Sequence, residues 1–239
     1  MKSYAVDLHI HTALSPCGSE EMTPNNILNM SALKGLDIIS ITDHNAIGNV
    51  LPCIEAGSKQ GMLVVPGIEI TTQEEVHLLA YFRTHKNLSD FFDSLSFFQS
   101  DLKNRPDIFG KQLLFNAEDE VIREETTLLM NAMQISFDQT VHLIHQFGGA
   151  AVPAHINRNS FSVLSSLGFL PDHLPIQCVE LFRGVDPKVF LKEHPEYRKY
   201  RHVNSSDAHC LADIMERIFF MELNECNAEN VIQWMTKEL

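Results

Sequence analysis

Three side chains that can bind a metal ion alternate along one short apolar segment near the start of the chain. The segment reads YAVDLHIHT, and Asp7, His9 and His11 occupy alternate positions. In a β-strand, alternate side chains point to the same side, so these three would share one face. Burying that face is costly unless something pairs with the polar groups. The segment therefore predicts either a face open to water or a binding site.

Other groups of the same kinds stand toward the carboxyl ends of later predicted strands. They are Asp43 and His44 after strand 36–42, Glu69 near the end of strand 62–70, His77 within strand 75–82, His155 after strand 150–154, and Asp207 and His209 after strand 202–206. In a β/α barrel that end of every strand faces one shared site. Each group alone could be a helix cap, a solvent-facing carboxylate or a half-buried histidine. Their joint placement favours a single metal centre.

Imidazole and carboxylate groups together are typical ligands of borderline divalent ions such as Zn, Mn or Fe. The candidate ligands outnumber what one four-coordinate ion needs, so we expect two or three ions that share at least one carboxylate. Ions about 3.5–4 Å apart suit phosphoryl transfer, because they clamp the phosphate and activate a water molecule. The set therefore predicts a metal-dependent phosphoric ester hydrolase.

The scaffold that would position these groups alternates strands with helices. Thr23 and Pro24 begin a helix that stops at Gly35, and a second helix near 48–59 ends at Gly61. Ser136 and Gln139 form a capping box at the start of a third helix, and Asn227 caps a final one. Further strands are predicted at 176–182 and 217–223. Strands 62–70 and 75–82 are separated by a turn short enough to connect them directly. The alternation favours a parallel sheet with helices outside, either closed as a barrel or open and doubly wound.

Length and composition favour one domain in the cytoplasm. The 239 residues are 44% apolar and predict a single catalytic domain over 1–239, with a mostly helical, Phe-rich excursion at about 87–135. The excursion could cover the site, form an oligomer contact or be a structural cluster. The five cysteines lack a CxxC pair, which favours reduced thiols. A long apolar run and a leader pattern are both missing, so we expect no membrane span.

Net charge narrows the expected partners. The chain carries a formal charge of −13 at pH 7, which argues against a broad surface for the phosphates of duplex DNA. We therefore expect a small phosphorylated substrate and no stable binding of duplex nucleic acid. The sequence predicts no particular oligomeric state.

The motifs as a set resemble those of the PHP (polymerase and histidinol phosphatase) family of metal-dependent phosphoesterases. The matching segments, in family order, are DLHIHT at 7–12, ITDHN at 41–45, GIEI at 67–70, the histidine of EVHLLAY at 75–81, VPAH at 152–155 and SSDAH at 205–209. The resemblance implies a distorted seven-stranded, TIM-like β/α barrel with two or three divalent ions at its carboxyl face. The strand at 217–223 would be a peripheral extra.

The resemblance also implies how the ligands are shared among the ions. His9, His11, Glu69 and Asp207 would surround one ion, Glu69 would bridge to a second held by His77 and His155, and His44 and His209 would help to bind a third. Asp43 would be a ligand or would support one. Asp7 would orient a ligand histidine by accepting its second ring N–H.

The loop after the first strand departs from the family pattern. Family members often have an SDG triplet there, whereas this chain reads SPCG with Cys17. A thiolate would be a soft ligand that favours Zn or Fe(II) over Mn. Alternatively, Cys17 only packs in the loop and the third ion is weakly held or missing.

Two arginines are candidates for holding the substrate. Arg158 and Arg183 follow predicted strands at the expected face, and a guanidinium can hold phosphate oxygens in a bidentate manner. Surface salt bridges are the alternative role for both.

The function predicted from these features is hydrolysis of a small phosphomonoester or nucleotide by metal-bound hydroxide, with Asp43 or His209 assisting proton transfer. An exonuclease or a nucleoside bisphosphate phosphatase is the alternative within this class. Metal-dependent amide hydrolysis is a different chemistry for the same kind of centre. A non-catalytic, metal-binding regulatory module is the alternative outside enzymes.

Overall fold

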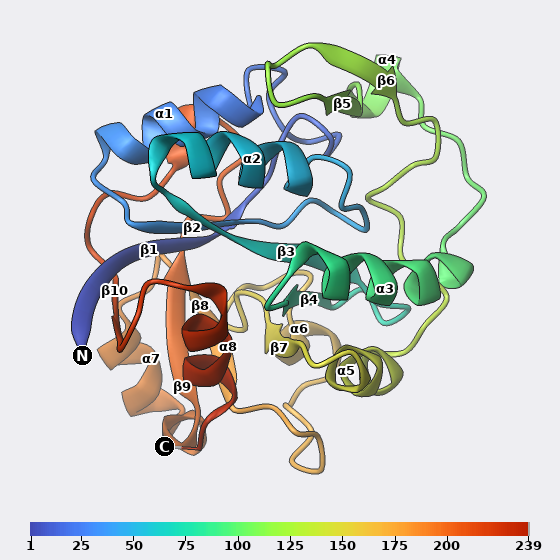
Figure 1. The fold of residues 1–239 in the computed structure, drawn as a ribbon. Helices are drawn as coiled ribbons and strands as arrows, with labels where there is room; N and C mark the ends of the chain where they lie inside the picture. Colours follow the sequence, from blue (N-terminus) through green and yellow to red (C-terminus); the bar gives the residue numbers. More distant parts are fainter. Residues whose placement is uncertain (239) are drawn as a thin grey trace.

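The computed structural model describes residues 1–238, and most of its strands form one curled sheet (Figure 1). The strand order is β10-β1-β2-β3-β4-β7. The bounds are Lys2–Ile10 for β1, Ile38–Ile41 for β2, Leu63–Thr71 for β3, His77–Tyr81 for β4, Ala150–Pro153 for β7 and Phe220–Leu223 for β10. Strands β1, β2 and β3 are parallel, whereas β4 is antiparallel to both of its neighbours. A direct turn from Thr72 to Val76 explains this reversal, because a parallel pair needs a long crossover.

The predicted closed barrel of seven strands is not confirmed. Over residues 1–238 the ladders form a six-stranded half barrel and a separate parallel pair, β8 (Cys178–Phe182) and β9 (Arg201–Ser205). A single bridge from Ile10 to Ala208 joins the loop after β9 to the end of β1. The seven predicted strands all form, but their ladder is not continuous. Strand β10 is antiparallel to β1 and extends the edge of the main sheet, as expected for an extra strand.

The four longer helices outside the excursion form where the sequence signals predicted, and the shorter ones were not predicted. They are α1 (Pro24–Leu33), α2 (Val50–Gln60), α5 (Phe137–Gln146) and α8 (Ala228–Thr236), with the shorter α6 (Val163–Ser166), α7 (Pro187–Glu193) and the 3-10 turns η2 (Pro195–Lys199) and η3 (Leu211–Asp213). Thr23 caps α1, Ser136 and Gln139 form the capping box of α5, and Asn227 caps α8. Gly61 ends α2 with φ at +73°, a conformation that glycine adopts without strain.

The excursion is only partly helical. It contains α3 (His85–Leu95), the 3-10 turn η1 (Ser96–Phe98) and the short α4 (Pro106–Phe109), and then a hairpin of β5 (Leu113–Phe115) and β6 (Val121–Glu124). The prediction of mostly helix is therefore wrong after Phe98. Asp119 at the hairpin turn has φ at +64°, which an aspartate tolerates and a helix does not. The hairpin packs on the loop that follows β1, since Leu113 donates its N–H to Ala13.

Apolar side chains fill both faces of the curled sheet. Helices α1 and α2 lie side by side over β1 to β3 (Figure 1), and their cluster includes Leu28 and Cys53. A second cluster joins Leu8 and Val65 of the sheet to Ile232 of α8. Within residues 1–238, no helix is long and apolar enough to cross a membrane.

Candidate metal centre

Glu69 of β3 lies at the middle of the candidate centre. Its side chain is fully buried. Five histidines face its two oxygens: His77 Nδ1 is 2.9 Å, His9 Nε2 3.3 Å and His155 Nε2 3.5 Å from Oε1, and His44 Nδ1 is 2.9 Å and His11 Nε2 3.3 Å from Oε2. These histidines come from β1, β4 and the loops after β2 and β7. The curl of the sheet therefore brings four separate segments to one carboxylate.

Asp207, in the loop after β9, adds a second carboxylate. Its Oδ1 lies 3.3 Å from the Nε2 atoms of both His9 and His11, which are themselves 3.1 Å apart. His209 stacks on His11 with ring centroids 4.1 Å apart, and its Nδ1 lies 2.9 Å from the carbonyl oxygen of Asp207. The loop after β9 therefore supplies two groups to the same centre.

Three overlapping groups of side chains could each hold a metal ion. Their ligand atoms lie within 4.8 Å of one another, and the groups are His9, His11, Glu69 and Asp207; His44, Glu69 and His77; and His11, His44 and His209. His155 stands just outside these groups, although it faces Glu69. Glu69, His11 and His44 each belong to two groups. The arrangement fits several ions bound close together.

The polar atoms of the centre mostly face one another. The nearest partners of both Glu69 oxygens are histidine ring nitrogens, and both ring nitrogens of His155 are buried without a hydrogen-bond partner within residues 1–238. Burying a carboxylate is costly unless a positive charge accompanies it. Divalent ions are the natural partners for imidazole nitrogens and carboxylate oxygens together. The residues therefore fit divalent metal ions.

The histidines and carboxylates shift one another's pKa values. Burial would raise the pKa of Glu69, but the charges of His77, His9 and His44 hold it well below its usual range. Burial would lower the pKa of His11 and His44, but hydrogen bonds and charge from the carboxylates raise both to about 9. For His77 burial prevails and the pKa falls to about 4. The metal-free centre therefore holds protons on some histidines at neutral pH.

Glu180 of β8 is a functional residue that sequence reasoning missed. It is buried, its Oε2 lies 3.0 Å from Nδ1 of His9, and the same oxygen accepts the backbone N–H of His155 at 3.0 Å. A carboxylate at Nδ1 fixes the proton there and leaves the Nε2 lone pair facing Glu69 and Asp207. The signal that could have found it was a lone acidic residue inside the apolar run QCVELF.

Asp7 does not orient a histidine, and that prediction is wrong. Its two carboxylate oxygens accept the backbone N–H groups of Ser206 and Met215, each at 2.9 Å. Both donors lie in the segment after β9. Asp7 therefore stabilises the loop that carries Asp207, because a buried carboxylate satisfied by two amide donors fixes the backbone around it.

Asp43 lies behind the centre. Its carboxylate accepts hydrogen bonds from the N–H and hydroxyl of Thr12 and from the hydroxyl of Ser15, each at 2.7 Å. Ser15 Oγ in turn lies 3.0 Å from Nδ1 of His11 and accepts the N–H of His44. Because the hydroxyl donates to Asp43, it accepts the Nδ1 proton of His11, which leaves Nε2 of His11 free to bind a metal. Asp43 belongs to none of the three groups found within residues 1–238.

Cys17 and the two arginines occupy less central positions. Cys17 is exposed and stands outside the three groups found in the described part of the chain, although its thiol lies beside His44 and helps to raise the pKa of that histidine. Arg158 lies at the centre's edge, where Nη1 donates to Asp207 Oδ2 at 2.7 Å and the guanidinium lies 5.3 Å from the ring of Phe182. Arg183 instead pairs with Asp213 of η3, at 3.1 Å. Of the two arginines, Arg158 is the one in contact with a candidate ligand.

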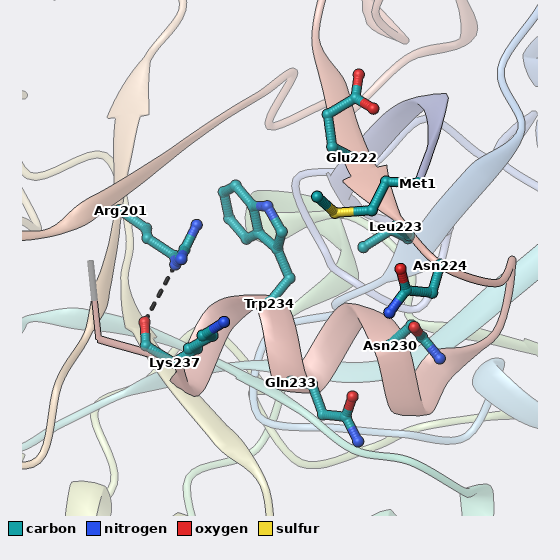
Figure 2. A pocket seen from close by; sticks show the side chains of 9 residues that line it. All are labelled: Met1, Arg201, Glu222, Leu223, Asn224, Asn230, Gln233, Trp234 and Lys237. Carbon is teal, nitrogen blue, oxygen red and sulfur yellow. Dashed lines mark hydrogen bonds between the residues drawn. The ribbon is translucent and has the colours of Figure 1, made fainter.

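A cavity of about 300 Å³ at the other end of the strands is separate from the centre (Figure 2). It is lined by Met1, Arg201 and Trp234, among others, and Arg201 lies 5.0 Å from the ring of Trp234. Strands β1 and β9 both start at this cavity and end at the metal centre. The cavity therefore has no direct part in the chemistry of the centre.

The curled sheet carries histidines and carboxylates at its carboxyl end that could hold divalent metal ions, an arrangement typical of metal-dependent phosphoesterases. The PHP domain model matches residues 7–163, and the chain belongs to that family. A proposed metal-dependent phosphoesterase from Bifidobacterium adolescentis has a similar fold, with a TM-score of 0.58 and 17% identity over 98% of this chain and 97% of the other.

Endonuclease Q from Pyrococcus furiosus also has a similar fold, with a TM-score of 0.72 and 17% identity over 98% of this chain and 56% of the other. An uncharacterised protein of Methanocaldococcus jannaschii is 38% identical over 78 residues, which cover 28% of this chain and 44% of the relative. The chain thus spans about half the length of these two relatives.

From the net charge we expected a small phosphorylated substrate and no binding of duplex nucleic acid. That expectation is wrong. A second structure of endonuclease Q, with a TM-score of 0.71 to this chain, contains a 27-mer duplex with an abasic lesion at the active site. The same fold therefore accommodates a duplex. Net charge averages over the whole surface and does not describe the potential at one face.

Proposed function

We propose that this protein is a metal-dependent phosphoesterase that hydrolyses phosphate esters at the Glu69 centre. The observation that carries the proposal is the fully buried carboxylate of Glu69, whose two oxygens are faced by five histidines. His9, His11, Glu69 and Asp207 would hold one ion, Glu69, His77 and His155 a second, and His44 and His209 a third. When bound, such ions supply the positive charge that phosphate oxygens and a leaving oxygen require.

The chain's own residues would bind and orient the reactants. Arg158 can hold a phosphate oxygen while it keeps its bond to Asp207, because a guanidinium has several donors. His209 is about a quarter exposed, and its Nδ1 lies against a carbonyl oxygen, so Nε2 is free to accept a metal or a proton. Asp43 would act by positioning His11 through Ser15 rather than by touching the reacting atoms.

The substrate would be a nucleotide, either free or within a nucleic-acid strand, and cleavage within a strand is the second candidate. The fold shared with endonuclease Q favours that second candidate. Cys17 would tune the third site toward Zn or Fe(II) if its thiolate reaches the ion. Arg183 would contribute to substrate binding only after leaving Asp213.

The test is hydrolysis of a panel of esters by protein as purified, after chelation, and after restoration with Zn, Mn or Fe(II). The panel contains glycerol phosphate, mononucleotides, nucleoside bisphosphates, single strands and a duplex with an abasic site. We expect two to three equivalents of metal, and activity that is lost on chelation and restored. Turnover by metal-free protein, or full metal occupancy with no ester hydrolysed, would reject the proposal; the latter result indicates a regulatory module.

A further inference from the structure

A cavity of about 570 Å³ shares a wall with the metal centre and lies outside the ligand groups described above. We name it the Arg158 pocket, and its lining includes Asn157, Arg158, Val185, Phe190, Glu193 and His194. Arg158 lines the pocket and also donates to Asp207. Asn157 and Arg158 follow His155 directly, so the pocket opens at the same end of the sheet as the centre. Its volume is typical of sites for small organic ligands.

One wall of the pocket is aromatic. The rings of Phe190 and His194 stack with centroids 4.8 Å apart, and Phe190 is nearly fully buried. Val185 adds apolar surface on the turn before α7. A flat, apolar wall favours a planar ligand group, because stacking on an aromatic ring is worth about 1–3 kcal/mol per base.

The polar groups of the pocket differ in how easily a ligand can reach them. Asn157 Oδ1 accepts the N–H of Phe182 at 2.7 Å and its Nδ2 is buried, so this amide supports the pocket rather than facing a ligand. Glu193, which is exposed, supplies an acceptor among the lining residues. A ligand with a donor at the edge of a planar ring would pair with Glu193.

We propose that the Arg158 pocket binds the nucleoside part of the phosphate ester whose phosphate lies between Arg158 and the metal centre. This inference rests on the proposed function and names the substrate class. A nucleobase combines a planar face with donors at its edge, which matches the stacked wall and the carboxylate of Glu193. The nucleoside comes either from a free nucleotide or from a nucleotide within a nucleic-acid strand.

The test fills the pocket and measures nucleoside binding directly. Val185→Trp places an indole in the cavity, and Val189→Trp is the matched control on an exposed position of α7 that does not line it. Binding of adenosine, guanosine, cytidine and thymidine to the metal-loaded protein is followed by calorimetry. We expect Val185→Trp to weaken the tightest of these by at least about tenfold, with no change for Val189→Trp. Hydrolysis of glycerol phosphate, which has no base, stays within about twofold in Val189→Trp.

A milder variant guards against misfolding of Val185→Trp. Glu193→Ala alters only an exposed side chain and should weaken guanosine binding by about threefold or more, because it removes the carboxylate that would accept the N–H groups of guanine. Unchanged nucleoside binding in both Val185→Trp and Glu193→Ala overturns the inference. So does a wild-type protein that hydrolyses glycerol phosphate but binds no nucleoside, a result that leaves the proposed function intact.

The opposite result separates the two proposals. Suppose that nucleosides bind, that Val185→Trp blocks their binding, and that the protein hydrolyses no ester with any metal. This result would support the nucleoside pocket and reject the proposed phosphoesterase activity. To identify the source of the nucleoside, KM is compared for the same nucleotide in three forms: free in solution, within a single strand, and beside an abasic site in a duplex. A lower KM for the strands, lost in Val185→Trp, indicates a nucleic-acid substrate.

Discussion

At the scale of single residues, the centre depends on which ring nitrogen of each histidine carries the proton. Glu180 fixes the proton of His9 on Nδ1, and Ser15, held by Asp43, does the same for His11. Both rings then present Nε2 to Glu69 and Asp207. The two carboxylates behind the histidines are therefore as important for metal binding as the groups that would touch the ions.

The variant Glu180→Gln tests this positioning role. The amide keeps the size of the side chain and one accepting oxygen but removes the negative charge beside His9, so the proton on Nδ1 of His9 is held less strongly. We expect metal affinity to fall by about 10–100-fold, measured by competition with a chelating dye. Glu222→Gln, on an exposed position of β10, is the matched control and should leave affinity unchanged. Equal affinities for both variants would assign Glu180 a packing role only.

Metal binding should depend on pH in a defined direction. In the metal-free chain the pKa values of His11 and His44 are raised to about 9, so both rings are protonated at pH 7. Binding requires neutral imidazole, so affinity should rise from pH 6 to about pH 9 and protons should be released. Calorimetry at pH 7 in buffers of different ionisation enthalpy measures the release. An affinity independent of pH would contradict the protonation of these rings.

The same shifts predict how stable the metal-free protein is. A histidine whose pKa is raised on folding stabilises the folded state below its unfolded pKa of about 6.5, and that contribution is lost as pH rises through about 9. The pKa values of Glu69 and Asp207 are lowered on folding, so their contribution to stability is lost only as the pH falls into the acid range. The Tm of the metal-free protein should therefore fall between pH 6.5 and 9.

At the scale of elements, the loop after β1 is held by the hairpin β5–β6 through one buried side chain. Asn49, which precedes α2, donates to Thr12 Oγ1 at 2.8 Å and to the carbonyl of Leu113 at 2.9 Å, and accepts the N–H of Phe115 at 2.9 Å. Thr12 also binds Asp43. The excursion therefore stabilises the loop that positions His11.

Removing that side chain should loosen the loop and the hairpin together. Asn49→Ala leaves three buried groups without their partner, so we expect a loss of about 2–4 kcal/mol in the free energy of unfolding, measured in urea. Asn26→Ala, at an exposed position of α1, is the control and should cost less than about 0.5 kcal/mol. Equal unfolding curves for the two variants would show that the hairpin does not stabilise the β1 loop.

At the scale of the whole molecule, the centre joins the two sheets. Glu69, His9 and His77 belong to the six-stranded sheet, whereas Asp207 follows β9 and Glu180 lies in β8. Few ladder bonds join these sheets, so ions shared by both would act as a cross-link. Metal binding would therefore help to hold the two sheets together.

Removal of metal should lower the stability of the protein. A site filled at 100 times its Kd stabilises the folded state by about 2.7 kcal/mol, so chelation should lower Tm by several degrees for each ion removed. Thermal unfolding with and without chelator measures the change. The Glu69→Gln variant removes the central charge and should show little further loss on chelation. A Tm that chelation leaves unaltered in the unmodified protein would argue against ions at this position.

The sequence by itself determined the groups that meet at the centre and the strands that carry them. Asp43, His44, Glu69, His77, His155, Asp207 and His209 stand near strand ends, and alternation along β1 places His9 and His11 on one face. These features are local, since strand periodicity and helix caps depend on neighbours in the chain. The motifs of the PHP family rest on the same local features.

Only the tertiary structure decided which groups support one another. Glu180 rather than Asp7 faces His9, across a separation of 171 residues, because the packing of β8 against β1 sets that contact. The curl of the sheet and the pairing of Arg183 with Asp213 likewise depend on contacts between segments far apart in the chain. Local patterns carry no information about such contacts, because the free energy that selects them arises from burial and pairing in the folded state.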